Sequence, residues 1–499
     1  MTSIDLAELA ALAGALGAVF VLVPRGVILP IAGFALVGLG IAGLGRSLVD
    51  ERTLELLFTE PLGLTLLASG TACAIVGAVP LARYPEVIPV VLLALAPFRI
   101  PVQLGDEEAF LLLPLYLGIA SSVLALAYRM SRGVRPTPPP FLLALPIAAL
   151  VTFTSISLLW TWDQERGAIV LAFFAFPFVA GFAVVARSPI APWLPRALLV
   201  TLVALGSLFA AVGIWQARTH TLFFARDVEV ANAYTTFFRV TSLFKDPSLY
   251  GRHVVVTIAV LLVAVLVRRG RTVDWLGATA LIAFLFWGLF YSYSQSSFVA
   301  LFAVTAAIGF LAGDRRTRAV LVSCAVVATL AAGVLAAQAS EGRSVRDVTS
   351  GRSRLVGITA DAFRMRPIAG VGVGGQPRAS AEAAGRRSSV RSASHTTPLT
   401  VLAELGLVGF ALYVWLLAAA TWALILVVRR DRTLGAGLAA ILLVLFVHSL
   451  LYAGFFEDPL TWGVLGIASA ALTSAMTAPE RERPPETAAP PQAPRLLAH

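Results

Sequence analysis

The chain has 499 residues, of which 58% are hydrophobic and only 13% are charged. Soluble domains carry about 25% charged residues, so this composition excludes an ordinary soluble protein. The net charge of +10 comes almost entirely from arginine, because Lys245 is the only lysine. No basic helix or aromatic platform for RNA accompanies this charge, which favours membrane lipids or phosphate-bearing molecules as partners and argues against nucleic acid.

Apolar runs of about 20 residues, the length needed to span a bilayer core, recur along the whole chain. They predict an all-α polytopic integral membrane protein with roughly 13–15 transmembrane helices. The short run at 86–98 contains Pro89 and Pro97, so we expect it to be re-entrant or broken. The predicted spans are 6–24, 26–45, 62–81, 86–98, 109–128, 141–162, 167–186, 193–215, 250–267, 275–291, 297–313, 319–338, 400–428, 434–455 and 459–476.

Arginine-rich connections alternate with neutral or acidic ones, and the positive-inside rule assigns the arginine-rich ones to the cytoplasm. The cytoplasmic set is 129–135, 187–196, 268–271, 315–318 and 429–432. The acidic connections at 106–108, 163–165 and 457–458 are expected on the extracytoplasmic side. Cys73 and Cys324 both lie inside apolar runs, so neither a disulfide framework nor a cysteine metal site is expected.

These assignments divide the chain into six parts. They are N-terminal transmembrane helices (1–215), a first extracytoplasmic loop (216–249), central transmembrane helices (250–338), a large arginine-rich extracytoplasmic loop (339–399), C-terminal transmembrane helices (400–477) and a disordered cytoplasmic tail (478–499). The large loop has ten arginines against four acidic residues. Either it is a solvated basic loop that touches anionic lipid, or it forms an anion-binding site at the outer membrane face.

Inside the large loop, residues 355–365 are predicted to form a short helix that Pro367 ends. A glycine-rich turn follows at 370–375. Because the turn follows a helix and not a strand, a dinucleotide-binding loop is not favoured.

His395 stands apart from the other four histidines because it ends the arginine-rich loop, directly before a predicted helix. His448 lies inside an apolar helix, where packing or interhelical hydrogen bonding is the simpler interpretation. No clustered carboxylate or histidine ligands accompany His395, so no metal site is predicted. A histidine among arginines at a membrane surface suits acid–base chemistry on a substrate whose leaving group is a phosphate anion.

Three motifs in chain order resemble those of the O-antigen ligase and O-antigen polymerase family of bacterial lipid-linked glycan transferases. The first is RVTSLFKDPSLYG at 239–251, and the second runs from GRSRL at 351–355 to RPIAGVG at 366–372. The third is SHTTPLTVLAELGLVG at 394–409. Thr396 and Ser248 replace asparagines that are usual in the family, and Ser-Gln-Ser at 294–296 stands where Ser-Arg is frequent.

The resemblance implies transfer of a glycan from an undecaprenyl-diphosphate carrier to an acceptor hydroxyl, without metal or cofactor, at the outer face of the bacterial inner membrane. Arg239 and Arg354 match the family's arginines, so they are expected to bind the diphosphate, with Arg352 as a substitute for Arg354. Guanidinium forks suit this role because they bind phosphate oxygens in a bidentate manner. His395 is expected to be the general base. Glu404 either has a catalytic role or only hydrogen-bonds nearby backbone.

Ligases, polymerases and protein O-glycosylating enzymes share these motifs, so the sequence does not name the acceptor. A different class is a transporter or flippase for a lipid-linked or anionic substrate. Such proteins place ionisable groups or broken helices at the membrane midplane, whereas the polar density here lies outside the predicted spans. A lipid-binding scaffold without activity is a third possibility.

Overall fold

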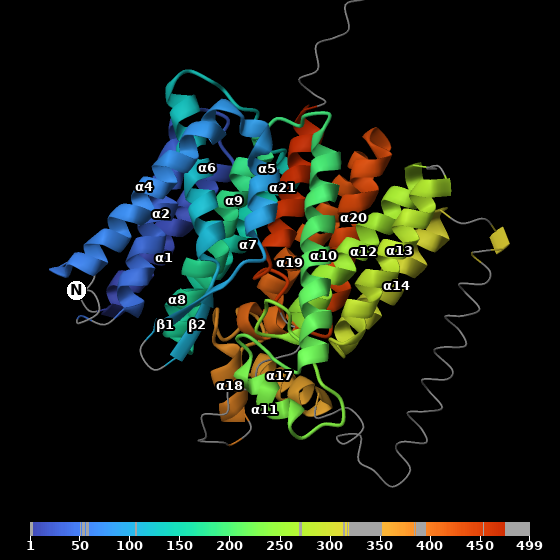
Figure 1. The fold of residues 1–499 in the computed structure, drawn as a ribbon. Coiled ribbons are helices and arrows are strands. Elements are labelled where there is room, and N and C mark those ends of the chain that lie inside the picture. The colour runs from blue at the N-terminus through green and yellow to red at the C-terminus, as the bar shows by residue number, and fades with distance from the viewer. Residues whose placement is uncertain are drawn as a thin grey trace, which may run out of the picture.

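The computed structural model describes residues 3–49, 51, 55, 59–104, 107–268, 272–312, 315–316, 318, 352–383, 385, 396–452 and 454–474. The described chain is a bundle of helices with a single two-stranded hairpin (Figure 1). This architecture confirms the predicted all-α polytopic class.

In the first half of the bundle, the described residues form nine α-helices and the hairpin. In chain order these are α1 (Ser3–Leu22), α2 (Ile28–Leu48), α4 (Pro61–Arg83), α5 (Ile88–Leu95), β1 (Ile100–Leu104), β2 (Glu107–Leu111), α6 (Leu113–Ser131), α7 (Phe141–Ile156), α8 (Gln164–Val170), α9 (Phe176–Ala186) and α10 (Leu194–Thr219). Two 3-10 turns, at Pro85–Val87 and Ser157–Trp160, and one π-helical turn, at Leu171–Ala175, join some of them.

The described elements of the second half are all helical. They are α11 (Arg226–Asn232), α12 (Pro247–Arg268), α13 (Thr272–Phe290), α14 (Gln295–Ala312), α17 (Arg352–Met365), α18 (Gln376–Ala383), α19 (Thr397–Arg430), α20 (Arg432–Ser449) and α21 (Pro459–Ser474).

Among the described residues, nine helices are long and apolar enough to cross a membrane, and five shorter apolar helices accompany them. This agrees with the predicted set of apolar spans, whose bounds differ from those of the helices by a few residues. The proline-containing fourth span is a 3-10 turn that runs directly into the short helix α5, and together they are shorter than a membrane-spanning helix. The predicted span at 319–338 lies outside the described residues.

The hairpin is an element that the sequence analysis missed. Residues 107–111 form β2, which pairs antiparallel with β1 so that Leu104 faces Glu107 and Ile100 faces Leu111. The span predicted from residue 109 therefore begins only at α6. The apolar–polar alternation of Ile100–Leu104 is the period of a strand, but the acidic residues beside it were interpreted as a loop.

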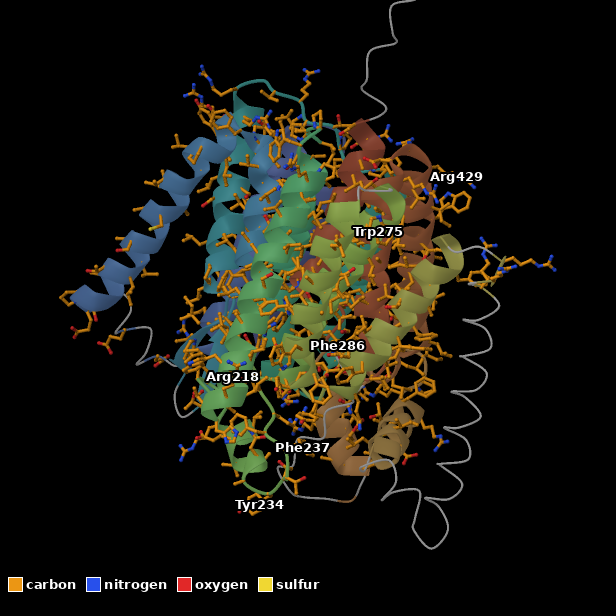
Figure 2. All side chains as sticks on the ribbon, turned by 45° about the vertical axis from the view of Figure 1, so that its right-hand side comes forward. Arg218, Tyr234, Phe237, Trp275, Phe286 and Arg429 are labelled. Carbon is orange, nitrogen blue, oxygen red and sulfur yellow. The ribbon has the colours of Figure 1, made fainter. Side chains whose placement is uncertain are left out.

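Two apolar cores organise the molecule. A continuous core runs through the helical bundle, and a small separate one joins Ala362, Val371, Ala379 and Ala403. The small core therefore unites α17, the glycine-rich turn, α18 and the first turns of α19. Figure 1 shows α11, α17 and α18 at one end of the bundle, and Figure 2 shows Arg429 near the other end.

Candidate active site

The predicted site residues are described to different extents. His395 lies outside the described residues, and Thr396, which follows it, is the N-cap residue of α19. Arg352 and Arg354 fall in the first turn of α17, where the backbone is described and the side chains are not. The side chain of Arg239 is described, and it is half-buried in the connection between α11 and α12.

Arg239 is held through its backbone by Asn232, the last residue of α11. The amide nitrogen of Arg239 donates to Asn232 Oδ1 at 3.0 Å, and Asn232 Nδ2 donates to the carbonyl of Arg239 at 3.0 Å. The side-chain Nε donates to the Ser292 carbonyl at 3.4 Å, between α13 and α14. Within the described part of the chain, the two terminal guanidinium nitrogens have no hydrogen bond. A guanidinium edge of this kind has the geometry to bind an anion.

Gln216 on α10 is a buried residue that shapes the same region and that the sequence analysis did not identify. Its Oε1 accepts from the amides of Thr241 at 3.2 Å and Ser242 at 2.7 Å, and its Nε2 donates to the Ser242 carbonyl at 2.9 Å. Ser242 has φ 52°, a left-handed conformation that an L-residue adopts only when its surroundings impose it. Gln216 thus stabilises the turn that follows Arg239.

Asp246 begins α12. Its Oδ1 accepts from the amide of Ser248 at 2.6 Å and from that of Leu249 at 3.4 Å, as expected of an N-terminal cap. These two bonds give Asp246 a structural role at the turn before Pro247. We call residues 239–253 the Arg239 segment, and side-chain hydrogen bonds from Asn232, Gln216 and Asp246 hold it in place.

The glycine-rich region is held differently. α19 is interrupted at Gly406, which has φ 64° and ψ −164°, so the helix cannot satisfy its own backbone there. Residues 367–376, which we call the glycine segment, supply the missing partners. Val371 N donates to the Ala403 carbonyl at 3.0 Å and Gly372 N to the Glu404 carbonyl at 2.8 Å.

On the other side of the break, the direction of the hydrogen bonds reverses. Leu407 N donates to the Pro367 carbonyl at 2.8 Å, and Val408 N donates to the Ile368 carbonyl at 3.2 Å. A Cβ at Gly406 would collide with the carbonyl oxygen of Ile368, and one at Gly370 would collide with that of Glu404. The glycines therefore allow two backbones to approach closely, and the amides of Val371 and Gly372 are used inside the protein.

Glu404 lies just before the break and contacts the start of α18. Its Oε1 accepts a hydrogen bond from the amide of Gln376 at 3.4 Å. Gln376 in turn donates through Nε2 to Ser380 Oγ at 2.8 Å and to Thr359 Oγ1 at 3.3 Å. These bonds tie α17, α18 and α19 together, which gives Glu404 the backbone-bonding role that the sequence left as one of two alternatives.

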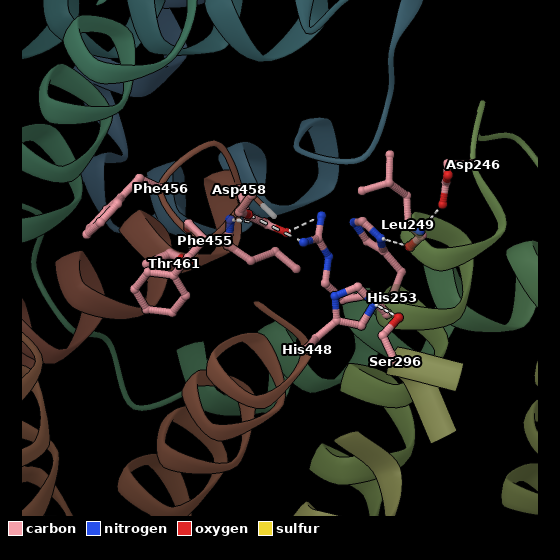
Figure 3. Close-up of polar contacts among 12 residues, drawn as sticks. Asp246, Leu249, His253, Ser296, His448, Phe455, Phe456, Asp458 and Thr461 are labelled. Atoms are coloured by element: carbon pink, nitrogen blue, oxygen red, sulfur yellow. Dashed lines mark hydrogen bonds and ion pairs between the residues drawn. The ribbon is translucent and has the colours of Figure 1, made fainter. Parts of the chain in front are cut away.

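A buried polar cluster lies between the starts of α12 and α14, the end of α20 and the connection before α21 (Figure 3). Arg252 Nη2 and Asp458 Oδ2 form an ion pair at 2.7 Å, and both side chains are almost fully buried. His448 Nε2 lies 3.1 Å from Ser296 Oγ, and His253 Nδ1 lies 2.8 Å from the Leu249 carbonyl. The sequence analysis did not predict this cluster, although Arg252 directly follows the 239–251 motif.

The side chains of Arg99 and Glu457 interact electrostatically with this ion pair, and both residues lie in connections between helices. Burial raises the pKa of the Glu457 carboxyl, and the guanidinium groups of Arg99 and Arg252 oppose that shift. Burial also lowers the pKa of Arg99, and the positive charge of Arg252 adds to the effect. Within the described ranges, no group of three histidine, cysteine, aspartate or glutamate side chains is arranged to hold a metal ion.

Comparison with known protein families matches residues 278–414 to the family described as O-Antigen ligase. A search of curated proteins gives no match. The matched residues run from α13 into α19, so they contain Arg352, Arg354 and His395, whereas Arg239 precedes them. The match confirms the predicted family resemblance. The roles assigned to the individual arginines and to His395 stay predictions.

Proposed function

Because residues 278–414 carry an O-antigen ligase domain, we propose that this multi-pass bacterial membrane protein transfers a glycan from an undecaprenyl-diphosphate-linked donor to an acceptor hydroxyl. The observation that carries the proposal is the Arg239 side chain. Its backbone is held on both sides by Asn232, and its outer nitrogens have no hydrogen bond to any described residue. A planar, permanently charged fork held in this way suits a diphosphate.

The reaction is a displacement at the anomeric carbon of the donor sugar. The acceptor oxygen forms a new bond to that carbon while the bond from the carbon to the diphosphate oxygen breaks. His395 takes the hydroxyl proton as general base, and the lipid diphosphate leaves as an anion. Arg239 and Arg354, with Arg352 as the alternative partner, stabilise the negative charge that builds up on the leaving group.

We place the site on the extracytoplasmic side. Alternation of arginine-rich connections supports this assignment, and Figure 2 places Tyr234 and Phe237 near the end opposite Arg429. Single cysteines test it in a background without Cys73 and Cys324. Tyr234→Cys and Glu382→Cys, both at exposed positions, should react with an impermeant thiol reagent in spheroplasts. Ser380 is buried and hydrogen-bonded, so it is a poor reporter. Labelling only after lysis would contradict the assignment.

The activity test uses the purified chain in proteoliposomes with a labelled undecaprenyl-diphosphate glycan and an extract of the host envelope as acceptor. We expect the label to move to the acceptor and to continue moving in EDTA, because no metal ligand set is predicted. Strict dependence on a divalent cation would contradict the mechanism.

The alternative function is a transporter or flippase, and the buried cluster around Arg252 is the observation that bears on it. Its members lie near the ends of their helices. Arg252 is in the second turn of α12, His448 is at the end of α20, and Asp458 precedes α21. This placement supports chemistry near one membrane face over a pathway through the midplane. Movement of intact donor across the bilayer, without transfer to the acceptor, would support the alternative.

A further inference from the structure

A cavity lies beside the first turns of α19, and no role has been assigned to it so far. It encloses about 780 Å³ of empty space, including its open mouth, and is bounded by α7, the π-helical turn, α19, α21 and the connection at 454–457. Its lining combines apolar, aromatic and acidic side chains, the mixture typical of a small-molecule site.

Two residues of the cavity wall follow the proposed general base closely in the sequence. They are Thr397 and Thr400, which follow His395 by two and five positions in the chain. The described contacts of Arg239 lead elsewhere, to the connection between α13 and α14. A molecule in the cavity would therefore lie beside the start of α19, away from the described contacts of Arg239.

The acidic side chains of Glu404 and Glu457, together with three threonines, form the polar part of a mostly apolar wall. Glu404 Oε1 is oriented by the amide of Gln376. Glu457 forms no hydrogen bond or ion pair with any described residue. Part of its surface is exposed, although the surrounding protein still raises the pKa of its carboxyl. Its carboxylate has the capacity to accept several hydrogen bonds from a ligand.

Aromatic side chains make up another part of the wall, among them Phe174, Phe456 and Trp462. Trp462 Nε1 donates to the Phe456 carbonyl at 2.8 Å, which fixes the orientation of the indole ring. An apolar, aromatic surface suits the C–H faces of a sugar ring, while the carboxylates suit its hydroxyl groups. A hydrocarbon chain would leave the Glu457 carboxylate desolvated and without a hydrogen-bond partner, which is costly.

We propose that this cavity binds a sugar residue of the acceptor, with the carboxylate of Glu457 accepting hydrogen bonds from its hydroxyl groups and the aromatic wall contacting its ring. This inference rests on the proposed glycan transfer. It makes the acceptor a glycan or glycolipid and excludes a protein side chain as the group that fills the cavity. It assigns Glu457 as a specificity-determining residue.

The first test separates acceptor from donor by steady-state kinetics in proteoliposomes. Glu457→Gln keeps the size of the side chain but replaces one acceptor oxygen by a donor. Loss of hydrogen bonds to a charged group should raise the KM for the envelope acceptor about tenfold and leave the KM for the labelled donor unchanged. Glu382→Gln, the same change at an exposed position on α18, serves as the control and should alter neither constant.

The second test does not need catalysis, so it remains informative if the proposed transfer is absent. Methyl hexopyranosides should slow hydrogen–deuterium exchange at 397–405 and 454–462 in the purified full-length chain, and Glu457→Gln should abolish this protection. Dodecanol is the comparison probe. Protection by dodecanol and not by the glycosides would overturn the proposal in favour of a hydrocarbon site. A rise in the donor KM instead of the acceptor KM would overturn the acceptor assignment.

Discussion

The Arg239 segment and the glycine segment lie at the same end of the bundle, yet different forces hold them. Side chains fix the first, because Asn232, Gln216 and Asp246 each bond to its backbone amides or carbonyls. Backbone fixes the second, because its amides and carbonyls bond directly to those on either side of the break in α19.

The difference predicts how each segment tolerates substitution. A segment held by side chains loses a defined number of hydrogen bonds when one holder is replaced, so damage should be graded. A segment held by backbone–backbone hydrogen bonds should tolerate many side-chain substitutions, but it has no room for a Cβ atom at its glycines. The predictions below are ordered from the largest expected effect to the smallest.

His395→Ala should have the largest effect, since the proposed base lies just before the helix that the glycine segment holds. Transfer should fall by about 10²–10⁴-fold, the usual contribution of a positioned general base, while donor binding stays nearly unchanged. Transfer by the unmodified chain should also decline at acid pH, with a midpoint at or below about 6.5, as the imidazole gains a proton. Near-normal turnover in His395→Asn would contradict the role.

Gly406→Ala should cost about 3–5 kcal/mol of stability, because it combines a strained left-handed backbone with a collision against the Ile368 carbonyl. Gly133→Ala is the matched control. Gly133 has φ 89°, but nothing lies within 4 Å of the added methyl group, so only the conformational cost of about 1–2 kcal/mol applies. Thermal denaturation of the purified protein measures both. Equal losses would show that the close approach is unimportant.

Gln216→Leu should cost about 2–3 kcal/mol, because it leaves two buried amides and one carbonyl of the Arg239 segment without partners. The affinity for donor should fall as well, since the turn after Arg239 loses its support. If the variant is destabilised but binds donor with unchanged affinity, the turn that Gln216 holds contributes to folding and not to donor binding.

Arg239→Lys and Arg354→Lys keep one positive charge but lose the planar fork. Each should raise the donor KM about tenfold or more, while expression and helix content stay normal. Arg352→Lys decides between the two candidates on α17. If it has the larger effect, Arg352 binds the diphosphate in place of Arg354.

The smallest expected effect is the coupling free energy between substitutions in the Arg239 segment's support and in the glycine segment's support. Gln216→Leu and Gly406→Ala disrupt separate sets of hydrogen bonds, so the double variant should lose the sum of the two single losses within about 0.5 kcal/mol. A larger coupling energy in denaturation measurements would mean that the two segments support each other.

The helices could be predicted from sequence because each apolar run is long and its ends carry arginine, proline or glycine. The break in α19 at Gly406 could not be predicted from sequence. A single glycine within an apolar run does not reveal it, and the residues that hydrogen-bond to the broken turn lie in the glycine segment, far away in the chain. The ion pair of Arg252 with Asp458 joins residues far apart in the chain, so no local pattern reveals it. The hairpin at 100–111 was missed because its acidic residues are typical of a loop.

The interruption at Gly406 also bears on how the protein is made. From Leu407 to Arg430, α19 is long enough at about 1.5 Å per residue to cross a hydrocarbon core of about 30 Å without its first turns. The insertion machinery therefore needs to recognise only this second part. The first turns, with unsatisfied carbonyls at Ala403 and Glu404, acquire their partners when they dock onto the glycine segment, which is synthesised earlier. Biogenesis thereby separates anchoring of the helix from assembly of the site.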